Sequence, residues 1–183
     1  ILLDTENPEA VLRDMAECGL LGSYMPAFGM LIGRVKYGLY RGHTLDEHVL
    51  RSIGVLDRIR RGGAEKDHPI ATKVLARTAN PVPYYLAVLM HESAETLTNP
   101  TPDKLRRRIE ASIRHLVTGD EELDNIVWAV ERYQMMANMA VRRNVMEERV
   151  IRRFATEVRT VERLNLLMVL TVCHLRMAGI NSW

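Results

Sequence analysis

The sequence has few aromatic residues, little cysteine and almost no net charge. Phe, Trp and Tyr make up 5% of its 183 residues, and it contains two cysteines. Because Cys18 and Cys173 lie far apart in apolar or helical stretches, nothing indicates a disulfide framework or a Cys–His zinc cluster, and a reducing compartment fits best. The formal net charge of +2 is too small to indicate nucleic-acid binding by itself.

The sequence also lacks a targeting or membrane signal. No apolar run reaches the length of a membrane span, and no signal-peptide pattern opens the chain, so we expect a soluble cytoplasmic protein without a membrane partner. With 47% hydrophobic and 26% charged residues, the length suits one compact domain over residues 1–183. The first residue is Ile1, so we expect this domain to be excised from a longer protein whose flanking domains are its partners.

Helical periodicity dominates the chain. No stretch shows sustained strand alternation, repeats or low complexity, so the sequence predicts an all-α bundle of about eight helices. Short helical turns are expected between residues 20 and 40, where an apolar run is interrupted at Pro26, Gly29, Gly33 and Gly38. Thr44 and Glu47 have the spacing of a capping box. The predicted helices begin near Asn7, Thr44, Pro69, Pro83, Thr101, Asp120, Asn144 and Thr160.

The stretch from Pro83 to Leu97 is predicted to form the central helix. Residues 84–90 are all apolar or aromatic, so a helix here must be enclosed by other helices on most sides. His91 and Glu92 follow at once, at the end where we expect this helix to leave the core for solvent. An imidazole and a carboxylate held there suit a metal or catalytic pair. The alternative is that both residues cap and solvate the helix end.

Two further histidines are predicted to approach this pair. His48 lies one position off the apolar stripe of its helix, and His174 lies on the inner side of the last helix. His48, His91, Glu92 and His174 would then converge from three helices, which makes them a candidate metal site. Taken alone, a histidine in the place of His48 is more often a half-buried structural residue than a ligand.

A basic run, Arg106, Arg107 and Arg108, lies on the outer face of the helix that begins near Thr101. Such a run can bind phosphate or an acidic partner, but it can also be a solvated helix face. Since no aromatic residue suited to base stacking lies nearby, nucleic-acid binding is the least favoured interpretation.

Four motifs carry a resemblance to a known family. They are Leu-Leu-Gly-Ser-Tyr-Met-Pro-Ala-Phe-Gly at 20–29, Tyr-Gly-Leu-Tyr at 37–40 followed by Thr-Leu-Asp-Glu-His at 44–48, Met-Ala-Asn-Met-Ala-Val-Arg-Arg at 136–143, and Leu-Thr-Val at 170–172 with Asn-Ser-Trp at 181–183. The chain resembles the HD phosphohydrolase superfamily, and within it the central HD domain of bacterial PII uridylyltransferase/uridylyl-removing enzymes. The resemblance covers nearly the whole chain. It implies an HD-like helical bundle, divalent-metal hydrolysis and a PII-type signalling protein as partner.

This chain differs from the family pattern at the positions that bind metal and substrate in the family. Where the family has His-Asp followed by Ile-Ala-Lys-Gly, this chain has His91-Glu92 followed by Ser-Ala-Glu-Thr, so Glu95 stands at the lysine position. The opposite charge would repel a phosphate. Tyr133 occupies a family histidine position, and His174 occupies the position of the C-terminal aspartate. Residues 98–103 have no counterpart of the family's Asp-His-Ser-Glu run.

Two functions therefore stay open. The first is a degenerate HD domain with lost or reduced hydrolysis, acting as a regulatory or interaction domain. The second is an active metal-dependent phosphodiester hydrolase that removes UMP from uridylylated PII. Three imidazoles and one carboxylate suit a single Mn, Fe or Zn ion rather than a two-metal centre, and the altered pattern is also compatible with no metal.

Overall fold

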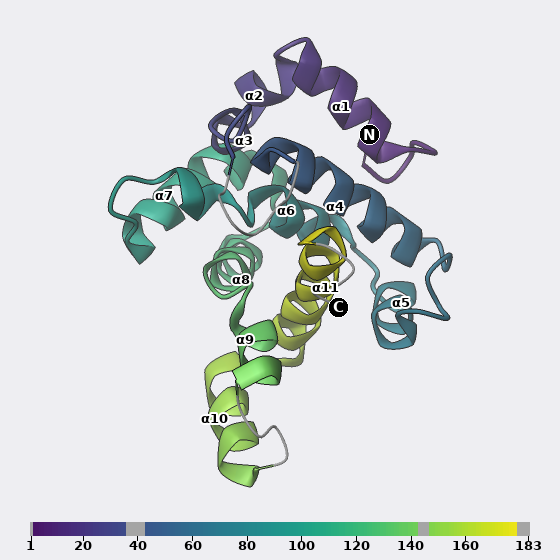
Figure 1. Ribbon diagram of the computed structural model, residues 1–183, viewed down its shortest axis with the longest axis vertical. Coiled ribbons are helices and arrows are strands. Elements are labelled where there is room, and N and C mark those ends of the chain that lie inside the picture. The colour runs from purple at the N-terminus through teal and green to yellow at the C-terminus, as the bar shows by residue number, and fades with distance from the viewer. Residues whose placement is uncertain (1, 36–42, 143–146, 179–183) are drawn as a thin grey trace.

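The protein is entirely helical in the regions that its computed structural model describes, residues 2–35, 43–142 and 147–178 (Figure 1). These regions contain eleven α-helices and two short 3₁₀-helices, η1 and η2, and no strand, which confirms the predicted all-α fold. The helices are α1 (Pro8–Glu17), α2 (Leu20–Tyr24), α3 (Pro26–Gly29), α4 (Leu45–Arg60), α5 (Pro69–Ala76), α6 (Val82–Met90), η1 (Ser93–Thr96), α7 (Pro102–Ile113), η2 (Arg114–Leu116), α8 (Asp120–Glu131), α9 (Met135–Arg142), α10 (Glu148–Val158) and α11 (Val161–Ala178).

The helix count exceeds the expected eight for two local reasons. The predicted turns after residue 20 form the short helices α2 and α3, with Pro26 at the first position of α3. The predicted helix that begins near Asp120 is also followed by an unexpected one, because α8 ends at Glu131 and α9 begins at Met135. The turn over residues 132–134 places Tyr133 in the interior, with 6% of its surface exposed. The Tyr-Gly-Leu-Tyr and Asn-Ser-Trp motifs lie outside the described residues.

Helix α6 is the centre of the bundle, as the sequence predicted, although it ends at Met90 and not at Leu97. Helices α4, α8 and α11 pack against it, and all seven residues from Tyr84 to Met90 are buried. Burying an apolar side chain contributes about 1.5–3 kcal/mol, so this short segment contributes heavily to the core. Helices α9 and α10 extend from the bundle as an arm at the lower end of Figure 1.

A polar contact fixes α4 against α6 inside this core. Tyr85 is fully buried, and its hydroxyl donates to Asp57 Oδ1 at 2.8 Å and accepts from Arg60 Nε at 2.8 Å. Burial raises the pKa of Asp57, but hydrogen bonds from Arg60, Arg61 and Tyr85 outweigh it and hold that pKa below its ordinary value. The ionised carboxylate is therefore satisfied although it is buried.

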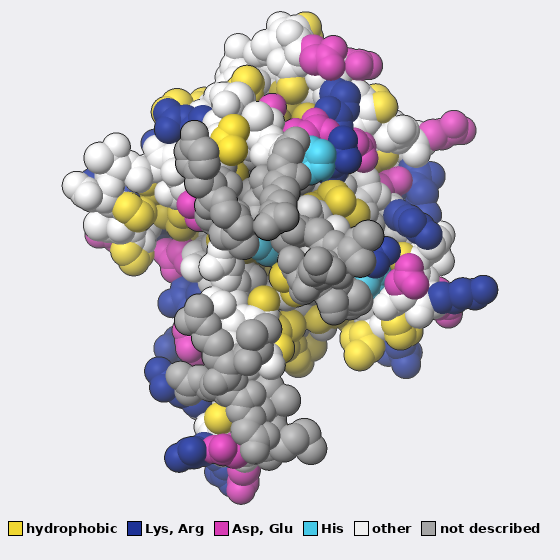
Figure 2. Space-filling view, viewed as in Figure 1, with side chains coloured by type: hydrophobic (Ala, Val, Ile, Leu, Met, Phe, Trp, Pro, Cys, Tyr) yellow, Lys and Arg dark blue, Asp and Glu magenta, His cyan; other side chains and the backbone are white. Residues whose placement is uncertain are grey.

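The surface carries no dominant charge on the face drawn in Figure 2, where Lys and Arg side chains are interspersed with Asp and Glu. Within the described ranges, none of the helices combines the length and the apolar character that crossing a membrane requires.

Candidate metal centre

Three helices bring four candidate ligands together in the interior. His48 comes from the first turn of α4, His91 and Glu92 follow the end of α6, and His174 comes from α11. One ligand atom from each of the four lies within 4.8 Å of the other three. At most 3% of any of these residues is exposed to solvent. The convergence expected from the helical faces is therefore present in the structure.

The distances between the donor atoms are those of a small coordination shell. His48 Nε2 lies 3.3 Å from His174 Nδ1, and Glu92 Oε1 lies 3.8, 3.5 and 3.5 Å from the nearest nitrogens of His48, His91 and His174. Four ligands at the usual bond lengths of about 2.0–2.1 Å around a tetrahedral ion are about 3.3 Å apart. The donor set and its spacing therefore fit one transition-metal ion of the Mn, Fe or Zn type.

The tautomer of His91 suits the same role. Its Nδ1 lies 2.6 Å from the backbone carbonyl oxygen of Val88. Because a carbonyl oxygen only accepts, Nδ1 must donate, and in the neutral ring Nε2 then keeps its lone pair. Nε2 is also the atom that faces Glu92 Oε1. A backbone carbonyl that fixes the tautomer of a histidine is a common support for a metal ligand.

The pair of His91 and Glu92 is more deeply buried than the sequence predicted. We expected it at the solvent end of α6, and this was wrong, because both residues have no exposed surface. The chain continues after them into η1, whose Ser93 and Thr96 are buried as well. Arg108 on α7 donates to Thr96 Oγ1 and, at 3.5 Å, to the carbonyl oxygen of Ser93. These contacts hold η1 over the end of α6.

His48 is also fully buried rather than half-buried. Helix α4 packs against α1 as well as against α6 and α11, so its buried surface is wider than one apolar stripe. His48 lies on the part of that surface that meets α6 and α11, where its ring centre is 5.3 Å from that of His91 and 5.2 Å from that of His174.

Tyr133 packs against the histidines of the centre. Helical periodicity alone did not predict this contact. The Tyr133 ring meets those of His91 and His174 edge to face, with centroids 5.4 and 4.8 Å apart. Burial, followed by the nearby carboxylates of Glu92 and Glu95, raises the pKa of the Tyr133 phenol above its ordinary value. At neutral pH this side chain is a neutral phenol and not an anionic ligand.

Tyr133 also lines a cavity of about 340 Å³. Its lining includes the carboxylates of Glu95, Glu131 and Glu157 and one cation, Arg132. Arg132 already pairs with Glu131 at 2.6 Å and with Glu157 at 3.3 Å. This cavity, which shares Tyr133 with the surroundings of the centre, is therefore acidic.

The arginines of the predicted basic run point to different places. Arg106 forms an ion pair with Asp124 of α8 at 2.6 Å, and Arg108 binds η1 as described above. Arg107 is exposed. The three guanidinium groups thus do not face one common ligand.

The fold and the cluster together define an all-helical protein with a buried three-histidine, one-glutamate centre. Its whole length is similar to proteins called bifunctional uridylyltransferase/uridylyl-removing enzyme. The identity is 31% over 183 residues for that of Phenylobacterium zucineum, 32% over 190 for Novosphingobium aromaticivorans and 33% over 186 for Cereibacter sphaeroides.

All of this chain aligns with each of these three enzymes, and it spans 20% of their length. The chain is therefore a homologue of one segment of the bifunctional uridylyltransferase/uridylyl-removing enzymes. No protein-family model matches the chain, and no solved structure matches it.

Proposed function

We propose that this chain is an HD-like domain of a nitrogen-sensing protein of the uridylyltransferase/uridylyl-removing type. In this proposal its hydrolytic activity is lost or strongly reduced, and the domain regulates the flanking domains of the longer protein or binds a partner such as PII. The observation that carries the proposal is the closed, fully buried set of His48, His91, Glu92 and His174.

A closed set of four donors favours a structural ion over a catalytic one. Structural sites surround a tetrahedral ion with four protein ligands, whereas catalytic sites keep a position open for water. A bound transition metal supplies Lewis acidity and lowers the pKa of a coordinated water toward about 7. If all four donors, which lie within 4.8 Å of one another, bind one tetrahedral ion, no position is left for that water.

The charges near the centre also disfavour a phosphodiester substrate. Glu95, Glu131 and Glu157 line the cavity beside Tyr133, and the one cation among them is already paired. A phosphodiester approaching from this side meets carboxylates of its own sign, and this repulsion is strong near a low-dielectric wall. Glu95 therefore acts against the binding of a nucleotide phosphate.

A second candidate function is that of an active hydrolase that removes UMP from uridylylated PII. The observation that favours it is the similarity of the whole chain to enzymes whose names include uridylyl-removing activity. In this case the ion would bind a water molecule as a fifth or sixth ligand, or one of the four donors would move away to admit it.

Elemental analysis combined with a hydrolysis assay separates the two functions. The purified chain is incubated with uridylylated PII and added manganese, with the full enzyme of Phenylobacterium zucineum as the positive control. We expect at most one transition-metal ion per chain and little or no release of UMP. Two stoichiometric metals, with rapid UMP release that disappears in His91→Ala, would refute the regulatory proposal and establish the hydrolase. A chain without metal and without hydrolysis would remove the structural ion from the proposal and leave the regulatory role.

A further inference from the structure

The first turn of α4 carries His48 but is not held by the expected capping box. Thr44 is the N-cap residue, as predicted, yet its side chain makes no capping hydrogen bond. The prediction that Glu47 would complete the box was wrong, because the Glu47 carboxylate binds side chains of other residues. A helix start without such a cap has backbone N–H groups that need other support, so this turn depends more on tertiary contacts.

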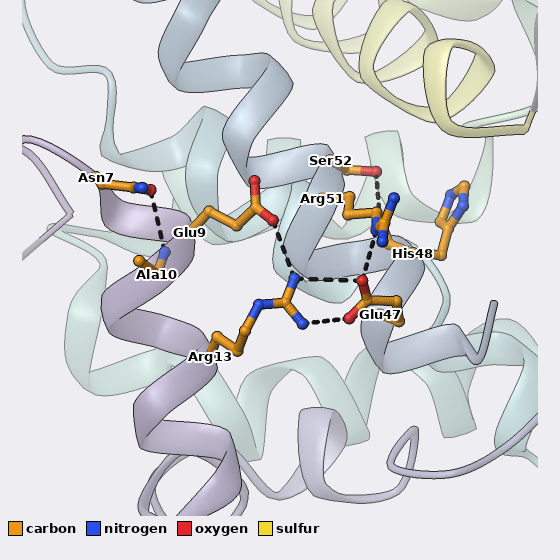
Figure 3. A network of polar contacts seen from close by, with 8 residues as sticks. All are labelled: Asn7, Glu9, Ala10, Arg13, Glu47, His48, Arg51 and Ser52. Carbon is orange, nitrogen blue, oxygen red and sulfur yellow. Dashed lines mark hydrogen bonds and ion pairs between the residues drawn. The ribbon is translucent and has the colours of Figure 1, made fainter.

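Arg13 of α1 binds that turn through Glu47 (Figure 3). Its Nη1 donates to Glu47 Oε2 and its Nη2 lies 3.3 Å from Glu47 Oε1, so the pair is bidentate. Arg13 Nη2 also donates to Glu9 Oε1 at 3.0 Å, and Arg51 donates to Glu47 from the next turn of α4. The hydrogen bond from Arg13 is the main reason why the pKa of Glu47 lies below its ordinary value.

The network sits where α1 and α4 approach each other closely. A Cβ atom at Gly54 of α4 would lie 2.1 Å from Glu9 Oε2, so a larger residue at this position would displace the carboxylate from where it now lies. The side chains of Arg13 and Glu47 are 33% and 21% exposed, which is much less than for a free surface pair. Partial burial and bidentate geometry distinguish this contact from exposed surface ion pairs, which contribute almost nothing to the free energy of folding.

Glu47 and the candidate ligand His48 are consecutive residues of one helical turn. Figure 3 shows the Glu47 side chain directed toward α1, while the His48 side chain extends away from this network. A movement of the turn would therefore be transmitted to His48 Nε2, which now lies 3.3 Å from His174 Nδ1. A binding site loses function when its groups move by more than about 0.5 Å.

We propose that Arg13 is a positioning residue for His48 and acts through Glu47. The packing of α1 against α4 then regulates the affinity of the four-donor centre for its ion. This inference rests on the proposed function only in that the centre must bind a transition metal. It does not depend on whether the domain hydrolyses a substrate.

Zinc affinity and the absorption spectrum of bound cobalt test this role. Arg13→Met removes both bonds to Glu47, and the matched control Arg152→Met removes an exposed pair with Glu148 on α10, in which both side chains are 78% exposed. We expect zinc binding, measured by competition with a chromophoric chelator, to weaken about tenfold in Arg13→Met, as for other residues that orient metal ligands. The cobalt spectrum should change with it, and Arg152→Met should leave both unchanged. Arg13→Lys should recover only part of the affinity, because an ammonium group cannot span both oxygens.

The outcomes separate this inference from the proposed function. Binding in Arg13→Met within twofold of the original chain, with an unchanged cobalt spectrum, would overturn the positioning role while the metal centre stands. If the original chain itself binds neither zinc nor cobalt, the metal centre and the positioning role fail together. Should Arg13→Met not fold by circular dichroism, Glu47→Gln, which keeps the side-chain shape, takes its place with the same expected loss.

Discussion

Zinc should stabilise the folded chain through the four-donor centre. His48 and His174 are 126 residues apart in sequence, so the unfolded chain cannot assemble the four donors. An ion that binds only the folded state at 100 times its dissociation constant stabilises that state by about 2.7 kcal/mol. For a chain of this size, about 1 kcal/mol corresponds to a shift of about 2–4 °C in melting temperature, so we expect Tm to rise by about 5–11 °C.

The assay is thermal unfolding followed by circular dichroism, in zinc buffer and with a chelator. Glu92→Gln keeps the shape of the buried side chain but replaces the carboxylate by a neutral amide, a weaker ligand, and should lose most of the zinc-induced shift. His115→Ala changes an exposed histidine outside the cluster and should keep the full shift, which controls for zinc bound elsewhere. A shift of equal size in Glu92→Gln, or no shift in the original chain, would refute the assignment of the ion to this centre.

Three further predictions concern the core around α6. Tyr85→Phe removes one hydroxyl with two hydrogen-bond partners and should lower the free energy of unfolding by about 1–2 kcal/mol in urea titrations. Asp57→Asn should destabilise the chain at pH 7, and its difference from the original chain should shrink toward pH 3. The reason is that a carboxyl pKa held below its ordinary 3.8 contributes stability above that pH, which is lost as the pH falls through the folded-state pKa; a difference independent of pH would contradict this. Leu89→Ala, at a fully buried position, should cost about 2–5 kcal/mol, and a loss below about 1 kcal/mol would show that α6 is not enclosed.

The central helix was predictable because its cause is local. Seven consecutive apolar residues admit one arrangement, burial on all sides, and α6 has it. The inward direction of His174 followed from the three- and four-residue spacing of α11 in the same way. The all-α fold needed nothing beyond such periodicities, because within the described part of the chain only helices form regular structure.

The features that could not be predicted depend on residues distant in sequence. The carboxylate of Glu47 binds Arg13, 34 positions away, instead of its own helix start. Arg108 binds η1 across 12 positions, and the end of α6 that was expected to face solvent is buried. Tyr133 enters the interior because α8 stops at Glu131, a break that apolar periodicity does not reveal. In each case a tertiary contact overrides the local pattern.

The contribution of α11 to the centre has a consequence for the order of folding. Chains are synthesised from the N-terminus, and their early segments begin to fold first. Helices α4 and α6, which pack against each other, leave the ribosome while His174 has yet to be synthesised. The incomplete centre then holds two histidines and one glutamate, too few for a closed tetrahedral shell. Metal occupancy of the proposed centre would therefore report that α11 has docked, so zinc binding can serve as a real-time readout of this docking step.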